Sequence, residues 1–304
     1  SGSPFPLYVS AAAASPNRTL VSEVVGSVAG RASTLRIDAV DRIETQDGCR
    51  VAQLRECATG LVLGVSLMLL PGVGVSFAVA GMTSALGRSH TFDGRADGYA
   101  RAESCRMFRL SVEGDGNENA NAVTVARASA VNQDGRSSSL TAPNGNAQRV
   151  VVAACDCDDD DDDVGVVAHL HGTGTPLGDP IEVSAVAATL ANARLEASKS
   201  WFGHAEPASG VVSLSCLVVH LTSRHSVGVC ALGDVNPYLT DVLASTTADA
   251  TANRARTSCA RVDGGASSFA FQGTNARVAI RRLRDVAVAR RAYRVDHAQR
   301  YWYL

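Results

Sequence analysis

Short runs of apolar residues, bounded by Gly, Pro or Asp, alternate along the chain with longer stretches rich in Ala, Val and Leu. The short runs predict buried strands and the longer stretches predict helices. The expected strands are Leu35–Asp38, Val123–Ala130, Val164–Ala168, Leu195–Ser200, Val262–Phe271 and Ala276–Arg281. The expected helices are Asn146–Ala154, Ile181–Ala193 and Gly210–Leu221. This mixture indicates a fold of the α/β class.

The stretch from His169 to Glu182 follows one of these strands and leads into one of these helices. It reads HLHGTGTPLGDPIE, and its two Gly–Thr pairs allow tight turns that bring the main chain close to a ligand. Asp179 suits the N-cap of the next helix, and Pro180 suits its first position. A histidine at a strand end, above such a turn, is placed like a catalytic acid or base.

One uncharged stretch, Gly60–Leu86, is long enough to span a bilayer. It is interrupted by Pro71 and by five glycines (Gly60, Gly64, Gly72, Gly74 and Gly81). These residues break a continuous apolar helix, and we therefore expect no transmembrane span.

Composition narrows the classes of protein. The chain has 304 residues, of which 46% are hydrophobic, enough for a large core. A net charge of −2 excludes a general nucleic-acid surface. The eight cysteines lack zinc-like spacing, so we expect free thiols in a reducing compartment, either cytoplasm or plastid, and no metal. The acidic run Asp156–Asp163 predicts a solvated loop or docking patch, since a plain run does not form a Ca²⁺ or Mg²⁺ cage.

Five sequence blocks together resemble one family. They are HGTGTPLGDPIE from His171, FDGRADGY from Phe92, VNQDGR from Val131 with LTAPNG from Leu140, KSWFGH from Lys199 with Glu206-Pro207, and SSFAFQGTNA from Ser267. In this order they resemble the signatures of β-ketoacyl synthases, the condensing domains of polyketide and fatty acid synthases. The resemblance covers roughly residues 17 to 282.

This resemblance implies a layered, thiolase-like (condensing-enzyme) α/β fold. It adds strands at Gly60–Leu70 and Tyr99–Val112 and a shortened helix at Val51–Cys57. Because the family has a longer segment before its nucleophile, we expect a truncated N-terminal half. The predicted units are a loose lead-in (1–16), a remnant of the first half (17–120), the second half (121–282) and a basic, aromatic tail (283–304). The tail's RYWYL resembles the linker that wraps modular condensing domains. The alternatives are a tail packed on the chain's own surface or one that docks into a partner.

The family also implies the roles of individual residues. Its two histidines, here His171 and His204, activate and decarboxylate a malonyl unit and polarise its thioester carbonyl, while Lys199 supports them. The substrate-binding positions carried over are Thr173, Thr175, Phe271, Gly273 and Thr274. No cofactor is expected. The bulky Trp201 and Phe202 are expected to narrow the acyl channel.

The nucleophile is the main departure from the family. On an ungapped alignment Asp41 stands where the family has its cysteine, and Arg42, Ile43 and Glu44 replace small serines. A carboxylate is a poor substitute, because an acyl-Asp is a mixed anhydride and lies uphill from a thioester. An anion there would also favour the charged forms of both histidines. Cys49 is the nearby alternative, but using it would delete several turns of the following helix.

Three hypotheses follow. The first is a degenerate, non-condensing ketosynthase-like protein that serves as a structural or accessory subunit of a larger assembly. The second is a ketosynthase-like acyltransferase or decarboxylase that acts on malonyl thioesters through His171 and His204. The third, full condensation through Cys49, is the least favoured. The expected partners are other subunits, a second copy or a ketosynthase partner, and an acyl carrier protein, with no nucleic acid.

Overall fold

The computed structural model describes residues 7–11, 22–28, 31–37, 59–111, 124–135, 142–156, 166–190, 192–223, 228–244, 249–250 and 263–282. The predictions for Asp41, Cys49 and the helix Val51–Cys57 lie outside the described residues. The same holds for the acidic run beyond Asp156 and for the tail from residue 283.

The first sheet has five strands in the order β2-β3-β1-β4-β5. Their bounds are Leu7–Ala11 for β1, Ser22–Val28 for β2, Arg31–Ile37 for β3, Thr59–Ser66 for β4 and Ser104–Ser111 for β5. β1 is parallel to β3 and β4, whereas β2 and β5 are antiparallel edge strands. The predicted strand Gly60–Leu70 is therefore confirmed only as far as Ser66. The chain leaves the sheet there, and the Met68 N–H donates to the Glu103 carboxylate at 2.7 Å.

The second sheet has six strands in the order β6-β11-β10-β7-β8-β9. They span Thr124–Gln133 for β6, Val167–His169 for β7, Arg194–Glu196 for β8, Asp249–Ala250 for β9, Asp263–Phe269 for β10 and Thr274–Arg282 for β11. β10, β7, β8 and β9 are mutually parallel, and β11 runs antiparallel between β10 and β6. The carboxyl ends of β7 and β8 consequently meet at one edge of the sheet.

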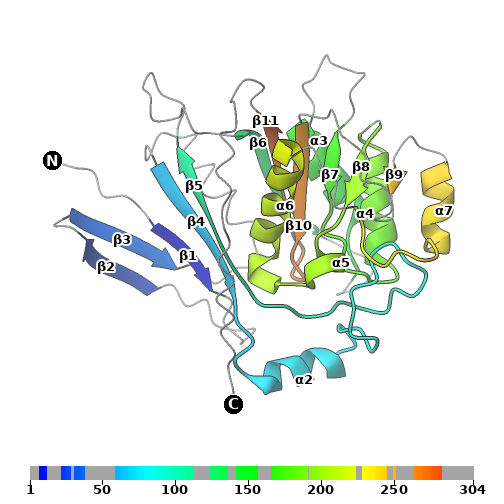
Figure 1. Ribbon diagram of the computed structural model, residues 1–304, viewed down its shortest axis with the longest axis horizontal. Helices are drawn as coiled ribbons and strands as arrows, with labels where there is room; N and C mark the ends of the chain where they lie inside the picture. Colours follow the sequence, from blue (N-terminus) through cyan, green and yellow to red (C-terminus); the bar gives the residue numbers. More distant parts are fainter. Residues whose placement is uncertain are drawn as a thin grey trace.

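Helices separate and cover the sheets (Figure 1). α6, Ser209–Ser223, contacts β4 and β5 of the first sheet and β7, β10 and β11 of the second. α3, Gly145–Asp156, and α4, Gly178–Ala187, cover the opposite face of the second sheet, and α7, Pro237–Ala244, packs on α4. The side chains of β7 alternate accordingly: Val167 packs with the leucines of α6, while Ala168 packs in the cluster with α3 and α4. These sheet and helix layers confirm the layered α/β fold.

α6 approaches the first sheet closely at one glycine. A Cβ on Gly64 of β4 would lie 3.0 Å from Val211 Cγ2 and 3.1 Å from Ala208 Cα. The absence of a side chain at this position therefore sets the distance between the first sheet and the central helix.

Two further helices, α5 and, farther from the strands, α2, lie below the second sheet in the view of Figure 1. α2, Pro71–Val79, has no buried residue, and none of the helices in the described part combines the length and apolar character needed to cross a bilayer. α5, Lys199–Phe202, is followed by the 3₁₀ turn η2, Glu206–Ala208. The prediction of a strand through Ser200 was wrong at its end, because β8 stops at Glu196 and Lys199 is already helical.

Candidate active site

The loop after β7 and the helix after β8 bring His171 and Lys199 together. The Lys199 ammonium donates to the His171 carbonyl oxygen at 2.5 Å and lies 3.2 Å from His171 Nδ1. The Phe269 backbone N–H, at the end of β10, donates to the same Nδ1 at 3.3 Å. Because Nδ1 accepts these contacts, the neutral imidazole of His171 carries its proton on Nε2.

His204 reaches the same place from the segment between α5 and α6. Its backbone N–H donates to the Ala100 carbonyl at 2.6 Å, and its own carbonyl accepts from the Ala102 N–H at 2.9 Å. Its Nδ1 accepts the Glu206 backbone N–H at 2.9 Å, so the neutral ring again carries its proton on Nε2. The centroids of the His171 and His204 rings lie 5.4 Å apart with the planes nearly perpendicular.

Both imidazoles are held in the neutral form. Burial, and next the positive charge of Lys199, place the pKa of His171 well below its ordinary value of 6.5. Burial and Lys199 also lower the pKa of His204 well below 6.5, with a further contribution from Arg101. A neutral Nε2–H pair can donate two hydrogen bonds to one electron-rich oxygen.

Two buried carboxylates hold the loop that carries His171. Glu182 accepts the His171 N–H at 2.7 Å and the Gly172 N–H at 2.8 Å. Asp179 accepts the Phe92 N–H at 2.9 Å and the Gly174 N–H at 3.1 Å. Burial raises the pKa of Asp179 to about 6 and that of Glu182 to about 7.

The N-cap prediction for Asp179 was wrong. α4 begins at Gly178 and its N-cap is Leu177, so Asp179 lies inside the first turn. Its carboxylate points back to the loop and serves the N–H groups of Phe92 and Gly174. Pro180 is therefore the third residue of the helix and not, as expected, the first. The helix also ends at Ala187, earlier than the predicted Ala193.

The predicted substrate-binding threonines lie on this same loop. Thr173 and Thr175 are half-buried, and their hydroxyls lie 3.1 Å apart. The Thr175 hydroxyl also accepts the Gly178 N–H at 3.2 Å. Thr175 therefore joins the loop to the start of α4, and a role in substrate binding stays a prediction for both residues.

The other three predicted residues lie at the β10–β11 turn. The Phe271 side chain is 54% exposed, and Gly273 has a φ of +89° that favours glycine. The Thr274 hydroxyl donates to the Gln133 side chain of β6 at 3.0 Å. Within this segment, Phe269 is the residue whose ring lies beside His171, at a centroid distance of 5.7 Å.

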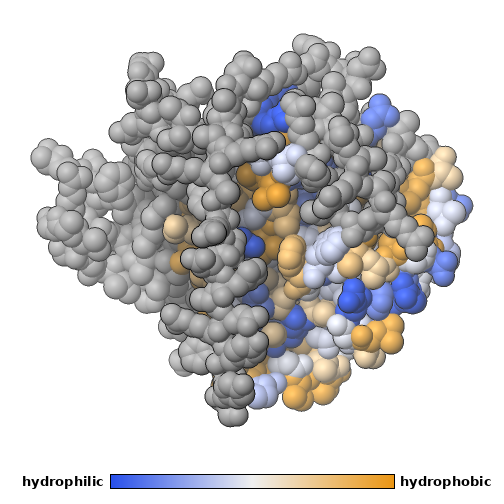
Figure 2. All heavy atoms as spheres, in the orientation of Figure 1, coloured by the Kyte–Doolittle hydropathy of each residue, from blue (hydrophilic) through white to orange (hydrophobic). Residues whose placement is uncertain are grey.

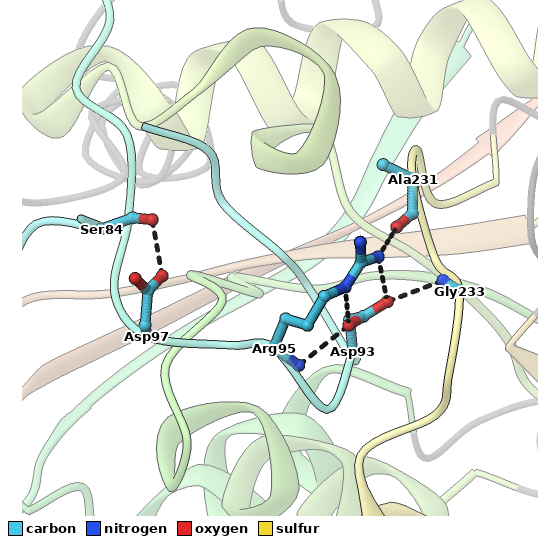
Figure 3. Close-up of polar contacts among 6 residues, drawn as sticks. All are labelled: Ser84, Asp93, Arg95, Asp97, Ala231 and Gly233. Carbon is cyan, nitrogen blue, oxygen red and sulfur yellow. Dashed lines mark hydrogen bonds and ion pairs between the residues drawn. The ribbon is translucent and has the colours of Figure 1, made fainter. Parts of the chain in front are cut away.

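The segment Phe92–Tyr99 anchors two neighbouring loops (Figure 3). Arg95 pairs with both oxygens of Asp93 at 2.7 and 2.8 Å, and Asp93 accepts the Gly233 N–H at 2.6 Å. Asp97 accepts the Ser84 hydroxyl at 2.5 Å. The Arg95 guanidinium holds the pKa of Asp93 well below its usual range. The segment thus joins the loops that carry Ser84 and Gly233.

Trp201 and Phe202 on α5 are 39% and 58% exposed. The expectation that they narrow an acyl channel stays a prediction. Asp41 lies outside the described residues, so its distance from His171 and His204 does not enter this geometry. Within the described ranges, no cluster of three His, Cys, Asp or Glu side chains could hold a metal ion.

Sequence reasoning missed several residues that position the site. Glu182 and Asp179 lie within the HGTGTPLGDPIE block, yet only the folded loop shows that they accept N–H groups of that loop. Phe269 contributes its main chain and ring, which no motif marks. Arg101 pairs with Glu206 across 105 positions of sequence, and only Glu206 lies in a quoted block.

The fold and the paired histidines define a thiolase-like protein of the condensing-enzyme class. The N-terminal domain of β-ketoacyl synthases matches residues 46–113, and the C-terminal domain of β-ketoacyl synthases matches residues 123–230. The chain therefore belongs to the β-ketoacyl synthase family, as the sequence blocks predicted.

Curated relatives are polyketide synthases. The chain is 33% identical over 258 residues to a phenolphthiocerol/phthiocerol polyketide synthase subunit of Mycobacterium tuberculosis, covering 79% of this chain and 11% of that protein. It is 32% identical over 234 residues to a highly reducing polyketide synthase of Aspergillus ruber, covering 73% of this chain and 10% of that protein. The chain thus spans about a tenth of the length of these relatives.

Solved ketosynthases share the fold. The ketosynthase from module 6 of the bacillaene synthase of Bacillus subtilis 168 superposes with a TM-score of 0.74 at 23% identity, covering 83% of this chain and 47% of that one. An oxazolomycin ketosynthase domain of Streptomyces albus JA3453 superposes with a TM-score of 0.72 at 25% identity, covering 79% of this chain and 44% of that one. This chain spans about half the length of each.

Proposed function

We propose that this chain binds a malonyl thioester through His171 and His204 and decarboxylates it without carrying out condensation. The observation that carries the proposal is the state of the two rings. Each Nδ1 accepts an N–H, so each neutral imidazole presents an Nε2–H donor. Asp41 at the nucleophile position argues against the acyl-enzyme that condensation requires.

The chemistry needs stabilisation of one developing charge. The bond between the carboxylate carbon and C2 of the malonyl group breaks, and CO₂ leaves. The electron pair moves onto C2 and the thioester oxygen, and a proton from solvent then completes an acetyl thioester. Two Nε2–H donors directed at that oxygen would stabilise the enolate. Neutral histidines suit this role because they donate from Nε2 without needing to gain a proton first.

The test is release of labelled CO₂ from a malonyl thioester carrying its label in the free carboxylate. We expect release above the uncatalysed rate, and we expect His204→Ala to lower kcat by about 10²–10³-fold, the usual cost of removing one oxyanion donor. His171→Ala should have a similar effect.

His220→Gln provides the control, because His220 is a buried histidine on α6 that pairs with Glu196 and is not one of the two proposed donors. Thermal melting of each variant separates loss of donors from loss of fold. Absence of CO₂ release by the folded wild-type chain would end the decarboxylase proposal. Condensation that disappears in Cys49→Ala would instead support the third hypothesis.

A second function, as an accessory subunit, is favoured by an exposed apolar surface around α2. We define the α2 surface by its large exposed side chains: Leu67, Met68, Leu69, Leu70, Val75, Val79 and Leu86. Figure 2 shows hydrophobic residues along the lower edge of the view, where Figure 1 places α2. Apolar surface of this kind is typical of contacts with other proteins. The relatives' place in polyketide synthases supports partners such as a ketosynthase or an acyl carrier protein.

The native mass of the chain purified from its source tests the accessory function. We expect a complex larger than the monomer, and we expect Val79→Asp on the α2 surface to dissociate it, since burying a charge in an apolar interface is costly. Tyr238→Ser on α7 is the control, because Tyr238 is also exposed but lies outside the α2 surface. A monomeric wild-type chain would contradict this function.

A further inference from the structure

The hydrogen bond that fixes His204 starts from a residue in an unusual conformation. Glu206 donates its N–H to His204 Nδ1 and has a φ of +43°, in the left-handed region. Residues other than glycine, asparagine and aspartate rarely adopt this region, and holding one there costs free energy. The surrounding structure must therefore supply contacts that hold this conformation.

An ion pair supplies such contacts. The Arg101 guanidinium donates from Nε and Nη2 to the two carboxylate oxygens of Glu206 at 2.6 and 3.0 Å. Both side chains are mostly buried, at 14% and 18% exposure, so the pair is only weakly screened by solvent. The geometry is that of a bidentate arginine–carboxylate pair.

Arg101 is itself held at the site. Its main chain forms a parallel β-bridge with His204, and its guanidinium stacks over the Phe77 ring of α2 at 5.2 Å. The ion pair thus joins the strand segment beside His204, the turn that follows His204, and helix α2. Burial, Lys199 and then the charge of Arg101 lower the pKa of His204, which is consistent with a neutral ring in this surrounding.

We propose that Arg101 and Glu206 are positioning residues that hold the main chain at Glu206 in its left-handed conformation and thereby lock His204 as the Nε2–H tautomer. Without the ion pair, residue 206 relaxes to negative φ and its N–H turns away from Nδ1. His204 then exchanges between its two tautomers and offers its Nε2–H donor for only part of the time. The inference about the tautomer stands on the free chain, and only its effect on decarboxylation rests on the proposed function.

The experiment measures the tautomer directly on the free chain by ¹⁵N NMR of the histidine rings, which distinguishes a protonated from an unprotonated ring nitrogen. We expect wild-type His204 to show protonated Nε2 and unprotonated Nδ1. We expect Arg101→Gln to show both tautomers, and its decarboxylation kcat to fall about tenfold, less than the full loss of a donor.

A pair of substitutions at residue 206 separates conformation from charge. In Glu206→Ala, His204 should show both tautomers, because alanine is strained at positive φ. Glu206→Gly should preserve the single tautomer better, because glycine adopts that region without strain. Equal tautomer mixtures in these two variants, or an unchanged single tautomer in Arg101→Gln, would overturn the proposal.

Arg281→Gln is the matched control, since Arg281 forms the same bidentate pair with Asp263, at 2.6 and 3.0 Å, near the end of β11 away from the turn. It should lose stability as Arg101→Gln does and leave the His204 tautomer unchanged. A mixed tautomer in this control would point to general loosening and contradict the specific role. Because the NMR readout needs no substrate, an inactive chain with the expected tautomers would refute the proposed function alone.

Discussion

Glu182 and Asp179 occupy one turn of α4 and hold different parts of the same loop. Glu182 binds the main chain of His171 and Gly172, whereas Asp179 binds Gly174 and Phe92 of the neighbouring segment. Both carboxylates are buried, and burial raises their pKa values toward neutrality. The anionic form of Glu182 accepts both N–H groups, so protonation of Glu182 should weaken the hold on the main chain of His171.

Glu182 should therefore set the acid limb of the decarboxylation rate. Its pKa is raised to about 7, so protonation begins as the pH falls through neutrality, and each further pH unit lowers the anion fraction about tenfold. Glu182→Gln should be slower at neutral pH and should lose this limb, because an amide does not titrate. The measurement is kcat against pH for both proteins. An identical limb in the variant would assign it to another group.

Gly174→Ala should be destabilising by about 1–3 kcal/mol from backbone strain, and by more from the clash. Gly174 has a φ of +77°, and a Cβ would lie 2.7 Å from the His90 backbone nitrogen. Gly81→Ala is the control, since Gly81 has a φ of +68° with no neighbouring atom within 4 Å. Urea unfolding of both variants isolates the clash as the difference between them. Equal losses would mean that the loop moves to accommodate the methyl group.

Among the elements, α6 packs against both sheets. Its leucines pack beneath β7 and β10, and its first turns lie against β4. The approach to β4 depends on Gly64, whereas the approach to the second sheet depends on complementary side chains. The spacing of the first sheet is consequently the more sensitive of the two to a single substitution.

Gly64→Val should lower the free energy of unfolding by about 1–3 kcal/mol, the usual cost of overpacking. The new side chain would press on Val211 and Ala208 and move α6 away from β4. Gly72→Ala on α2 is the control, because a Cβ there meets no atom within 4 Å and alanine favours a helix. Chemical denaturation gives both values. A neutral Gly64→Val would show that α6 shifts without cost.

At the scale of the whole molecule, ionisable groups lie buried between the second sheet and α6. The fully buried His220 and Glu196 pair at 2.9 Å. His169 is also fully buried, and neither of its ring nitrogens has a hydrogen-bond partner among the described residues. Burial lowers the pKa of His169 to about 4, from 6.5. The folded chain therefore takes up this proton less readily than the unfolded chain.

His169 should make the fold sensitive to acid. Its contribution is fully present above pH 6.5 and is lost as the pH falls toward 4, by about 1.4 kcal/mol per pH unit, because only the unfolded chain binds the proton there. The raised pKa values of Asp179 and Glu182 act in the opposite direction, so the difference between wild type and His169→Asn is the useful quantity. Denaturant unfolding at several pH values measures it. A difference that is constant with pH would contradict the buried neutral histidine.

The sequence by itself determined the kinds of element and their order. The short apolar runs predicted β7, β10 and β11, and the longer stretches predicted α3, α4 and α6, since local periodicity and turn residues decide these features. The ordered blocks also predicted the family and placed His171, His204 and Lys199 in one site. The proposed unit boundaries after residues 16, 120 and 282 stay predictions, as do the roles of Thr173, Thr175 and Phe271.

Tertiary structure alone decided which atoms meet. Some of these contacts join residues that are far apart in the sequence, such as the Arg101–Glu206 pair and the contact of Phe269 with His171. Others, such as those of Asp179 and Glu182 with the loop, depend on the direction in which a side chain points. The folded structure also showed that β8 ends before Lys199, and that the Asp179 carboxylate accepts N–H groups from Phe92 and Gly174. Local sequence pattern does not predict such contacts, because they form and contribute to stability only when distant elements pack together.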